Sequence, residues 1–445
     1  MSETSSTYPG TELTGDGPVT HGERINSLDI MRGVALFGIL LMNIAGMGLP
    51  RAYGDPTIYG GAEGLDLLAW VTTNMFFEGT MRGMFSLLFG AGIILLASRA
   101  EAKSDSVKIA DIYYRRNVLL VLFGMAHAYL LLWVGDILFY YAIAALFLFP
   151  LRKAAPKTLL IMGLSINVIL FIWSFAEREV LLDKHEAYEA ALVVKDSGVE
   201  LDENQNEAIE TWEGVLKDAK PTEKELQEII DYRRGGYFGI VKNQASIVFH
   251  YESEIAYRYL VLDAMAFMLI GMALMKGGVL TLEKSRNFYW MLILFGYGIG
   301  LTVNGYETRI IIDGGFDMLS TTQAGVTYDI GRIGTTAGHL GLLALFCSCN
   351  CLHWLKIRLA AVGRMALTNY ISHSVIAIFV FTGLGFGLFG ALARHQLFYV
   401  VLGVWIFQLI TSKIWLHHFR FGPLEWCWRS LTYMEKQPMR RVLKD

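Results

Sequence analysis

The sequence predicts an all-α fold: a polytopic bundle of about ten membrane-spanning helices that carries a polar, helical insertion. Hydrophobic residues make up 54% of the chain and charged residues only 18%, and the mean hydropathy is +0.41. A soluble domain needs more charge to cover its surface, so lipid must be the solvent for much of this one. Apolar stretches of about 20 residues, the length that crosses the hydrocarbon core, recur along the chain.

Ten apolar stretches are predicted to cross the membrane. They are Ile30–Leu49, Thr80–Ser98, Asn117–Val134, Ile137–Leu151, Thr158–Ala176, Arg258–Met275, Asn287–Asn304, Asp329–Cys349, Met365–Leu388 and Leu397–Leu416. The apolar segment from Leu65 to Phe77 lies directly before the second of these with almost no loop between them. It is interpreted as an interfacial or re-entrant helix, and an eleventh crossing is the alternative.

Basic residues fall in alternate loops, which predicts that both termini face the cytoplasm. Examples are Arg115 with Arg116, Lys153 with Lys157, and Arg440 near the end. The expected division is a disordered tail (1–24), an N-terminal membrane half (25–176), a polar insertion on the outer side (177–257), a C-terminal membrane half (258–420) and a cytoplasmic tail (421–445).

The insertion has the mixed charge of a soluble protein. Thr222 and Glu225 follow Pro221 in the pattern of a capping box, which predicts a helix that continues through Lys224, Leu226 and Ile229. Two interpretations stay open: a lid over a site in the membrane, or a spacer that packs on the outer surface.

Several classes of function are excluded or disfavoured. The net charge of −3 gives no support for nucleic-acid binding. No phosphate-binding glycine loop occurs in a strand–turn–helix setting, which argues against ATP-driven chemistry. Cys347, Cys349 and Cys351 lie close to His353. The cysteines are interpreted as small apolar residues at a helix end, in preference to a metal site. Helical spacing would put Cys347 and Cys351 on one face, with Cys349 pointing away.

Charged residues at membrane depth are costly unless they are paired or wetted, so each is a candidate for function. Asp29 and Arg32 are spaced to pair on one helix, or Arg32 receives an anionic group of a ligand. Glu78 and Arg82 are spaced to form a surface pair or to line the mouth of a cavity. Asp136, at the turn between two spans, either orients a neighbouring group or caps the next helix.

Three histidines fall near the middle of predicted spans. His127 lies eleven residues after Arg116, roughly 16 Å along the same helix face. His339 shares a face with Arg332, and His373 shares one with Asn369. Imidazole exchanges protons near neutral pH, so His127, His339 and His373 are the candidate general bases if they meet in one chamber. Each could instead be a satisfied hydrogen-bond bridge between helices.

Several long motifs resemble the YeiB-like bacterial membrane family, a domain of unknown function (DUF418). They are RINSLDIMRGVALFGILLMNI, FFEGTMRGMFSLLFGAGIILLASRA, YYRRNVLLVLFGMAHAYLLLWVGDILFYYAI, GRMALTNYISHSVIAIFVF and FRFGPLEWCWRSLTY. This resemblance implies a multi-pass protein of the bacterial inner (plasma) membrane.

The opening segment is also distantly similar to membrane acyltransferases such as heparan-α-glucosaminide N-acetyltransferase. That similarity implies that acyl-CoA enters from the cytoplasm, with the LD-x-x-RG signature at Leu28, Asp29, Arg32 and Gly33. Sugar O-acetyltransferases carry a His where this chain has Asn43, which cannot act as a base, so another histidine must do so.

The function expected from these observations is acyl transfer from acyl-CoA to a hydroxyl or amine acceptor. Arg32, Arg115 and Arg116 would bind the CoA phosphates, and a buried histidine would deprotonate the acceptor. Acyl-CoA is then a co-substrate, with no tightly bound cofactor and no metal, and the partners are the bilayer and a small-molecule or glycan acceptor. The alternatives are a secondary transporter, in which the histidines relay protons, and a non-catalytic membrane scaffold.

Overall fold

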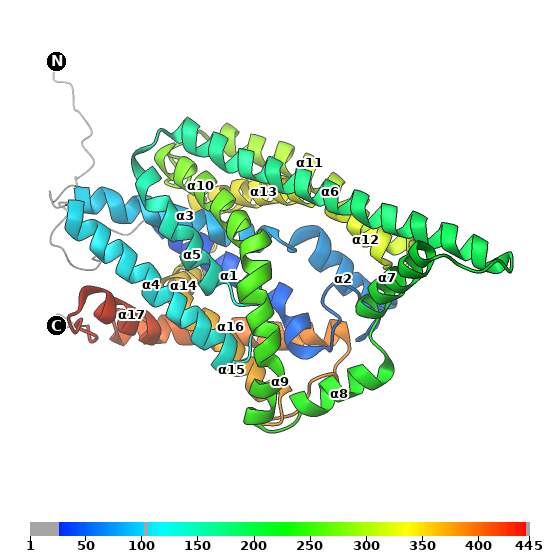
Figure 1. Cartoon of the computed structure of the whole chain (residues 1–445). Coiled ribbons are helices and arrows are strands. Elements are labelled where there is room, and N and C mark those ends of the chain that lie inside the picture. Colours follow the sequence, from blue (N-terminus) through cyan, green and yellow to red (C-terminus); the bar gives the residue numbers. More distant parts are fainter. Residues whose placement is uncertain (1–25, 102–105, 442–445) are drawn as a thin grey trace, which may run out of the picture.

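The structure, a computed structural model, describes residues 26–101 and 106–441 and consists of helices (Figure 1). The predicted tail 1–24 lies outside the described residues. In chain order the helices are α1 (Asn26–Gly48), α2 (Gly64–Phe76), α3 (Thr80–Glu101), α4 (Ser106–Leu130), α5 (Leu138–Leu148), η2 (Phe149–Lys153), α6 (Pro156–Asp196), α7 (Glu203–Ala219), α8 (Glu223–Arg233), α9 (Tyr237–His250), η3 (Tyr251–Leu260), α10 (Val261–Lys276), α11 (Arg286–Asp313), α12 (Met318–Gly325), α13 (Tyr328–Ser348), α14 (His353–Arg364), α15 (Ala366–Phe381), η4 (Arg394–Gln396), α16 (Leu397–His418) and α17 (Pro423–Tyr433). Within the described ranges strand-like pairing is confined to an isolated bridge between Phe419 and Arg440. The predicted all-α class is confirmed.

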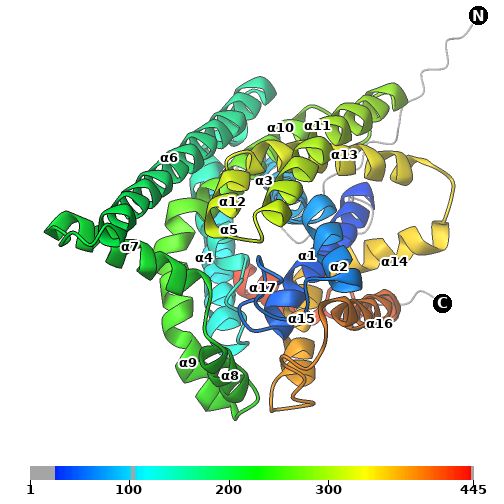
Figure 2. The ribbon, with the colours of Figure 1, turned by 90° about the vertical axis from the view of Figure 1, so that its right-hand side faces the viewer.

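Helix α1 lies inside the bundle, and α6, α11 and α16 lie outside it. Most side chains of α1 are buried, and Figure 2 shows α6 and α16 on opposite sides with α1 between them. The outer helices expose large apolar side chains, among them Ile172, Leu294 and Phe407. An apolar exterior of this kind is stable only in lipid, so the chain is a membrane protein.

By length and composition, seven described helical segments could cross a membrane, or eight if α14 and α15 are counted as one span bent by 83°. The predicted count of ten is therefore higher than the structure supports. Helices α2 and α3 form one candidate span, Gly64–Ser98. The Leu65–Phe77 segment is thus the first part of that span, not a crossing of its own.

The difference in count comes mainly from the predicted spans Asn117–Val134 and Ile137–Leu151. In α4 the apolar stretch begins only after Arg116, and the helix ends at Leu130. Helix α5 has 11 residues, which is about 16 Å at 1.5 Å per residue, half of the hydrocarbon thickness. Between them, residues 131–137 form an irregular turn inside the bundle, with Leu132 in the left-handed region at φ 57°.

The polar region 177–257 consists of extensions of membrane helices at its two ends and of the separate helices α7 and α8 between them. Helix α6 has 41 residues and extends well past the bundle toward α7 (Figure 1), and α9 runs through the π-helical η3 into α10. The capping box is confirmed: Glu225 N donates to Thr222 Oγ1 at 3.3 Å, and Thr222 N donates to Glu225 Oε2 at 2.7 Å. Helix α8 begins at Glu223 as the pattern predicts.

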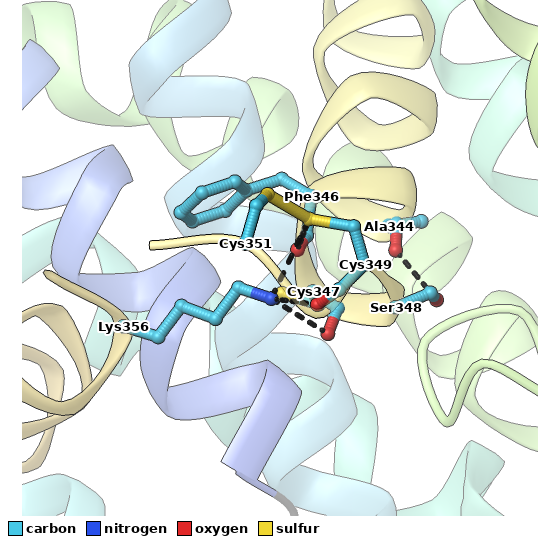
Figure 3. Close-up of a disulfide and its surroundings, with 7 residues drawn as sticks. All are labelled: Ala344, Phe346, Cys347, Ser348, Cys349, Cys351 and Lys356. Carbon is cyan, nitrogen blue, oxygen red and sulfur yellow. Dashed lines mark hydrogen bonds between the residues drawn. A yellow bond between two sulfur atoms is a disulfide. The ribbon is translucent and has the colours of Figure 1, made fainter. Parts of the chain in front are cut away.

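The cysteine segment corrects the sequence interpretation. Helix α13 ends at Ser348, so Cys349 and Cys351 lie in the irregular link before α14, where they form a disulfide (Figure 3). Lys356 Nζ donates to the carbonyls of Cys347, at 3.3 Å, and of Cys349. The helical spacing assumed for the three cysteines was wrong because the helix stops before the second one.

Residues 421–441 pack against the bundle. Helix α17 contacts α4 and α15, and Trp428 Nε1 donates to the carbonyl of Arg116 at 2.9 Å. Figure 1 shows α17 at the opposite end of the molecule from α7. The bundle therefore has a basic end, at α17 and the start of α1, and an insertion end, at α8 and α9.

Candidate functional site

Two cavities enter the bundle from its two ends. The first, the basic cavity, has a volume of about 250 Å³, and the second, the insertion-side cavity, about 530 Å³. The basic cavity is lined by the arginines Arg32, Arg116, Arg364 and Arg429 and by an apolar interior of Leu88, Phe89, Ile93, Leu96 and Leu120. Cationic groups at an apolar hollow suit a ligand that has both anionic and apolar parts.

The basic cavity depends on close packing of α1 and α14. A Cβ on Gly33 would lie 2.3 Å from the carbonyl oxygen of Leu359, and one on Gly363 would lie 1.9 Å from that of Asp29. The two glycines thus let the helix backbones touch, which brings Arg32 beside Arg364. Arg32 Nη1 donates to Asp29 Oδ1 at 3.1 Å, so the predicted pair is confirmed, and both residues also line the cavity.

Neighbouring Arg115 and Arg116 have different roles. The guanidinium of Arg116 lies 4.0 Å from the ring centroid of Trp428, and no carboxylate among the described residues forms an ion pair with it. Arg115 pairs with Asp111 and donates to the carbonyl of Thr432. Arg115 does not line the basic cavity, so the structure does not group it with Arg32 and Arg116.

A chain of three side chains, Ser374–His127–Asp136, lies between the cavities. His127 Nδ1 is 2.6 Å from Asp136 Oδ1, and His127 Nε2 is 2.7 Å from Ser374 Oγ. An ionised carboxylate only accepts, so Nδ1 carries the proton and Nε2 accepts from the serine hydroxyl. All three are buried. A hydroxyl that is hydrogen-bonded to an imidazole, which a carboxylate orients in turn, is the arrangement of an activated nucleophile.

Asp136 combines the two roles that the sequence left as alternatives. Its Oδ1 orients His127, and its Oδ2 accepts from the backbone N–H of Phe139 at 2.8 Å, in the first turn of α5. The bond to Phe139 N holds the Asp136 carboxylate in place, and the carboxylate holds the His127 imidazole in its orientation.

The first turn of α5 separates the two cavities. Leu138 and Tyr141 line the basic cavity, whereas Ile137 and Tyr140 line the insertion-side cavity. Tyr370 completes the partition: its hydroxyl accepts from Ile137 N at 3.1 Å, and its ring packs edge-on against His127 with centroids 4.9 Å apart.

Helix α15 reaches both sides of this partition. Tyr370 lines the basic cavity. One turn later, Ser374 lines a small pocket that shares Trp133 and Arg233 with the insertion-side cavity. The hydroxyl that His127 contacts therefore lines the small pocket and lies one helical turn from Tyr370 of the basic cavity.

The insertion-side cavity is lined at its base by the bundle and on its outer side by the insertion. Asn43, Glu78, Arg82 and Asp136 belong to the bundle part. The insertion contributes Ile229, Tyr232 and Arg233 of α8, Asn243, Gln244 and Ile247 of α9, and Tyr251 and Glu252 of η3. This placement favours the lid interpretation over the spacer.

Glu78 and Arg82 line this cavity and are bonded to other partners. Tyr53 donates to Glu78 Oε2 at 2.7 Å, and Arg82 Nε lies 3.3 Å from Asp263 Oδ2. Asp263 also pairs with Arg332, 2.5 Å from its Nη2. The cavity-mouth interpretation of Glu78 and Arg82 therefore fits the structure better than a surface pair.

Arg332 belongs to a buried ion-pair cluster. Besides Asp263 it contacts Asp329 Oδ1 at 2.6 Å, and its side chain is 1% exposed. Two arginines and two aspartates in the cluster balance in charge, which offsets part of the cost of burying them. Arg332 does not line either cavity.

The expectation that three imidazoles share one chamber is wrong for His339. Its Nδ1 contacts Tyr297 Oη at 2.7 Å and its Nε2 the carbonyl of Phe76 at 2.8 Å. Both nitrogens are thus used in bridging α13 to α11 and α2, the alternative that the sequence analysis left open.

His373 lies nearer to His127 but belongs to a helix contact. Both rings pack against Tyr370, yet His373 Nε2 is 3.3 Å from Gln408 Oε1 on α16. Asn369 joins the same contact: its Nδ2 donates to Ser412 Oγ at 3.0 Å and to the carbonyl of Val362 at 3.1 Å. Neither side chain lines a cavity.

Sequence reasoning missed Ser374, Tyr370, Arg364, Arg429 and the ion-pair partner Asp263. A signal existed for Tyr370 and Ser374, which are one turn apart in the segment NYISHS beside His373. Asp263 lies inside an apolar span, and that alone marks it as a candidate.

The comparisons with known proteins agree with the sequence motifs. Residues 274–435 match the family described as protein of unknown function (DUF418). The chain is 29% identical to the uncharacterized protein YxaH of Bacillus subtilis over 96% of this chain and 98% of the relative. It is 28% identical to the uncharacterized protein YeiB of Escherichia coli K12, over 94% and 98%.

Residues 274–435 thus match the DUF418 family, and the chain along nearly its whole length is similar to YxaH and YeiB. No solved structure matches the chain. The matched DUF418 region supplies Arg364, Tyr370, Ser374 and Arg429, while His127 and Asp136 come from the chain before it. The candidate site thus requires both parts of the chain.

Proposed function

We propose that this protein is a membrane acyltransferase that moves an acyl group from acyl-CoA to a hydroxyl or amine acceptor. The observation that supports it is the Ser374–His127–Asp136 chain between a cavity lined by arginines and a second cavity at the opposite end of the bundle. The basic end would face the cytoplasm, in agreement with the distribution of Lys and Arg.

Acyl-CoA fits the chemistry of the basic cavity. Its phosphates would bind Arg32, Arg116, Arg364 and Arg429, since guanidinium groups bind phosphate in a bidentate manner. The pantetheine arm and the thioester would follow the apolar wall toward Tyr370 and Tyr141. Helix α5 and Tyr370 keep water from crossing between the cavities, which protects a reactive thioester from hydrolysis.

His127 would act as the general base and Ser374 as the nucleophile. Ser374 Oγ attacks the thioester carbonyl carbon as its proton passes to His127 Nε2. The C–S bond breaks, and the CoA thiolate takes that proton. The acceptor then attacks the acyl-serine ester, its proton passes to Nε2, and Ser374 Oγ recovers a proton as the ester bond breaks. Asp136 positions the imidazole and stabilises the imidazolium.

The test uses purified full-length protein in nanodiscs with [¹⁴C]acetyl-CoA and needs no known acceptor. We expect label to accumulate on the peptide that contains Ser374, as shown by protease digestion and mass spectrometry. His127→Ala and Ser374→Ala should abolish it. His339→Ala is the matched control, because it removes a buried, doubly bonded imidazole outside the site.

Different outcomes separate the alternatives. If acyl transfer to an added acceptor persists in Ser374→Ala and is lost in His127→Ala, the acyl-serine intermediate is ruled out. The acceptor would then attack the thioester directly. Absence of both acetyl-CoA binding and label would reject the enzyme proposal. Solute uptake into proteoliposomes that follows a pH gradient, without acyl turnover, would replace it with a carrier.

A further inference from the structure

Arg233 is a buried cation without an acidic partner. It ends α8, is 9% exposed, and lines both the insertion-side cavity and the small pocket beside Ser374. Its polar side-chain partner is neutral: Nη1 donates to Gln244 Oε1 at 3.4 Å. Among the described residues, no carboxylate lies within the 4 Å of an ion pair with Arg233.

Burying an uncompensated guanidinium costs free energy, and burial here lowers the pKa of Arg233. Such a group is usually completed by a ligand or a partner charge. The aromatic ring of Phe389, 5.0 Å from the guanidinium, compensates only in part.

An unsatisfied donor lies beside Arg233 in the same hollow. Trp133 Nε1 is buried without a hydrogen-bond acceptor, and Trp133 lines the same cavity and the same small pocket as Arg233. Glu252 supplies an acceptor instead: it lines the cavity, and its buried Oε1 has no hydrogen-bond donor. The cavity therefore offers two donors for an anion and one acceptor for a hydroxyl or ammonium group.

Apart from Glu252, the other charged side chains that line the cavity are bonded within the protein, including Arg51, whose Nη2 donates to the carbonyl of Asp218 at 2.6 Å. Arg82 pairs with Asp263, Glu78 accepts from Tyr53, and Asp136 is bonded to His127. Arg233 is thus the cation that would contribute most to the binding free energy of an anionic ligand.

The backbone holds Arg233 in place. Gly383 N donates to the carbonyl of Arg233 at 3.3 Å, and the next residue, Arg234, donates through Nε to the carbonyl of Phe389 at 2.9 Å. Both bonds fix the end of α8 on the segment after α15, so the side chain of Arg233 is preorganised, and a preorganised cation binds an anion without first being ordered.

From this geometry we propose that the insertion-side cavity binds an anionic acceptor: a molecule with a phosphate or carboxylate group held by Arg233 and Trp133 Nε1, and a hydroxyl or amine directed toward Ser374 and Glu252. The inference rests on the proposed function, because it names the class of acceptor for that site. The same anionic chemistry could belong to a free metabolite or to a lipid headgroup.

The test measures binding in the absence of acyl-CoA, so it is independent of acyl transfer. Glycerol 3-phosphate is the probe, glycerol is its neutral control, and the readouts are the shift in melting temperature and the quenching of tryptophan fluorescence in phosphatidylcholine nanodiscs. Nanodiscs that contain phosphatidylglycerol, without free probe, form the lipid arm.

We expect glycerol 3-phosphate, or phosphatidylglycerol in the lipid arm, to stabilise the wild type, and glycerol to have no effect. Arg233→Gln should weaken binding about tenfold or more, the usual scale for losing a hydrogen bond to a charged group. Trp133→Phe, which keeps the aromatic ring and removes only the N–H, should weaken it about threefold to tenfold.

Lys242→Gln is the matched control, since it removes one positive charge from α9 at an exposed position that does not line the cavity. Equal weakening by Arg233→Gln and Lys242→Gln would overturn the proposal, as would binding of glycerol equal to that of glycerol 3-phosphate, or no binding of either anionic probe. If Arg233→Gln fails to fold, the Trp133→Phe comparison decides in the same way. If neither anionic probe binds but Ser374 is still labelled by acetyl-CoA, the anionic acceptor is ruled out and the acyltransferase proposal stands.

Discussion

The two ends of the bundle are built in different ways. At the basic end the backbones of α1 and α14 touch at Gly33 and Gly363, and α17 is fixed through Trp428. At the insertion end the cavity is covered by α8, which is bonded at its C-terminal end to the segment after α15, and by α9, where Tyr237 Oη donates to the carbonyl of Leu130 at 2.7 Å. Elements with few packed contacts open at lower free energy. The difference indicates one fixed entrance and one that can open.

The largest effect is expected at the point where the two ends meet. Asp136→Asn replaces the acceptor of the His127 Nδ1 proton with an amide that can turn its N–H₂ toward the ring. Turnover of acetyl-CoA should fall about 100-fold or more, while acetyl-CoA binding, measured by calorimetry, should stay unchanged.

A comparable loss of binding in Asp136→Asn would instead mean that Asp136 maintains the partition between the cavities and does not act through His127. The two entrances would then depend on each other.

The basic end should be intolerant of added volume. In Gly363→Ala the new methyl group would meet the carbonyl of Asp29, and overpacking of this kind costs about 1–3 kcal/mol. The melting temperature in nanodiscs should fall, and acetyl-CoA affinity should fall with it because Arg32 and Arg364 move apart.

Gly92→Ala is the control for this change. Gly92 also lines the basic cavity, and a Cβ there meets no atom within 4 Å. It should be neutral or slightly stabilising. Equal destabilisation by both changes would contradict the view that close helix contact defines this end.

The smallest effect is expected in the cover. Thr222→Ala removes the N-cap of α8, which costs about 0.5–2 kcal/mol of helix stability, and it also removes one of the hydrogen bonds by which Thr222 lowers the pKa of Glu225. Hydrogen exchange should become faster in residues 223–233 and stay unchanged in α1 and α14.

Lys224→Ala is the control on the same helix. The Lys224–Glu228 pair is solvent-exposed, with N and O 3.9 Å apart, and such pairs contribute little. If Thr222→Ala also changed exchange in α1, the cover and the bundle would form one cooperative unit, and the contrast between the two ends would fail.

Much of the fold could be predicted because it depends on local pattern. Apolar length identified most of the spans, and the Thr222–Glu225 spacing placed the start of α8. Helix α5 could not be recognised as a short element, since the apolar run Ile137–Leu151 looks the same whether it crosses the bilayer or forms the interior wall between two cavities.

The site was predictable only where its chemistry lay along one helix or turn. Asp29 with Arg32 follows from spacing, and intramembrane position singled out His127. The meeting of His127 with Ser374 joins residues 247 positions apart, and the bridging role of His339 depends on a backbone carbonyl of α2. Such contacts depend on how distant helices pack, and spacing within one segment of the sequence does not reveal that packing.

The continuity of α9, η3 and α10 has a mechanical consequence. Because the cover continues without a break into the helix that carries Asp263, any tilt of α9 is transmitted along one rod to the charge cluster. The wider turns of η3, from Tyr251 to Leu260, are the place where such a rod can bend. A displacement of α10 would therefore act on Arg82 and Arg332, which pair with Asp263.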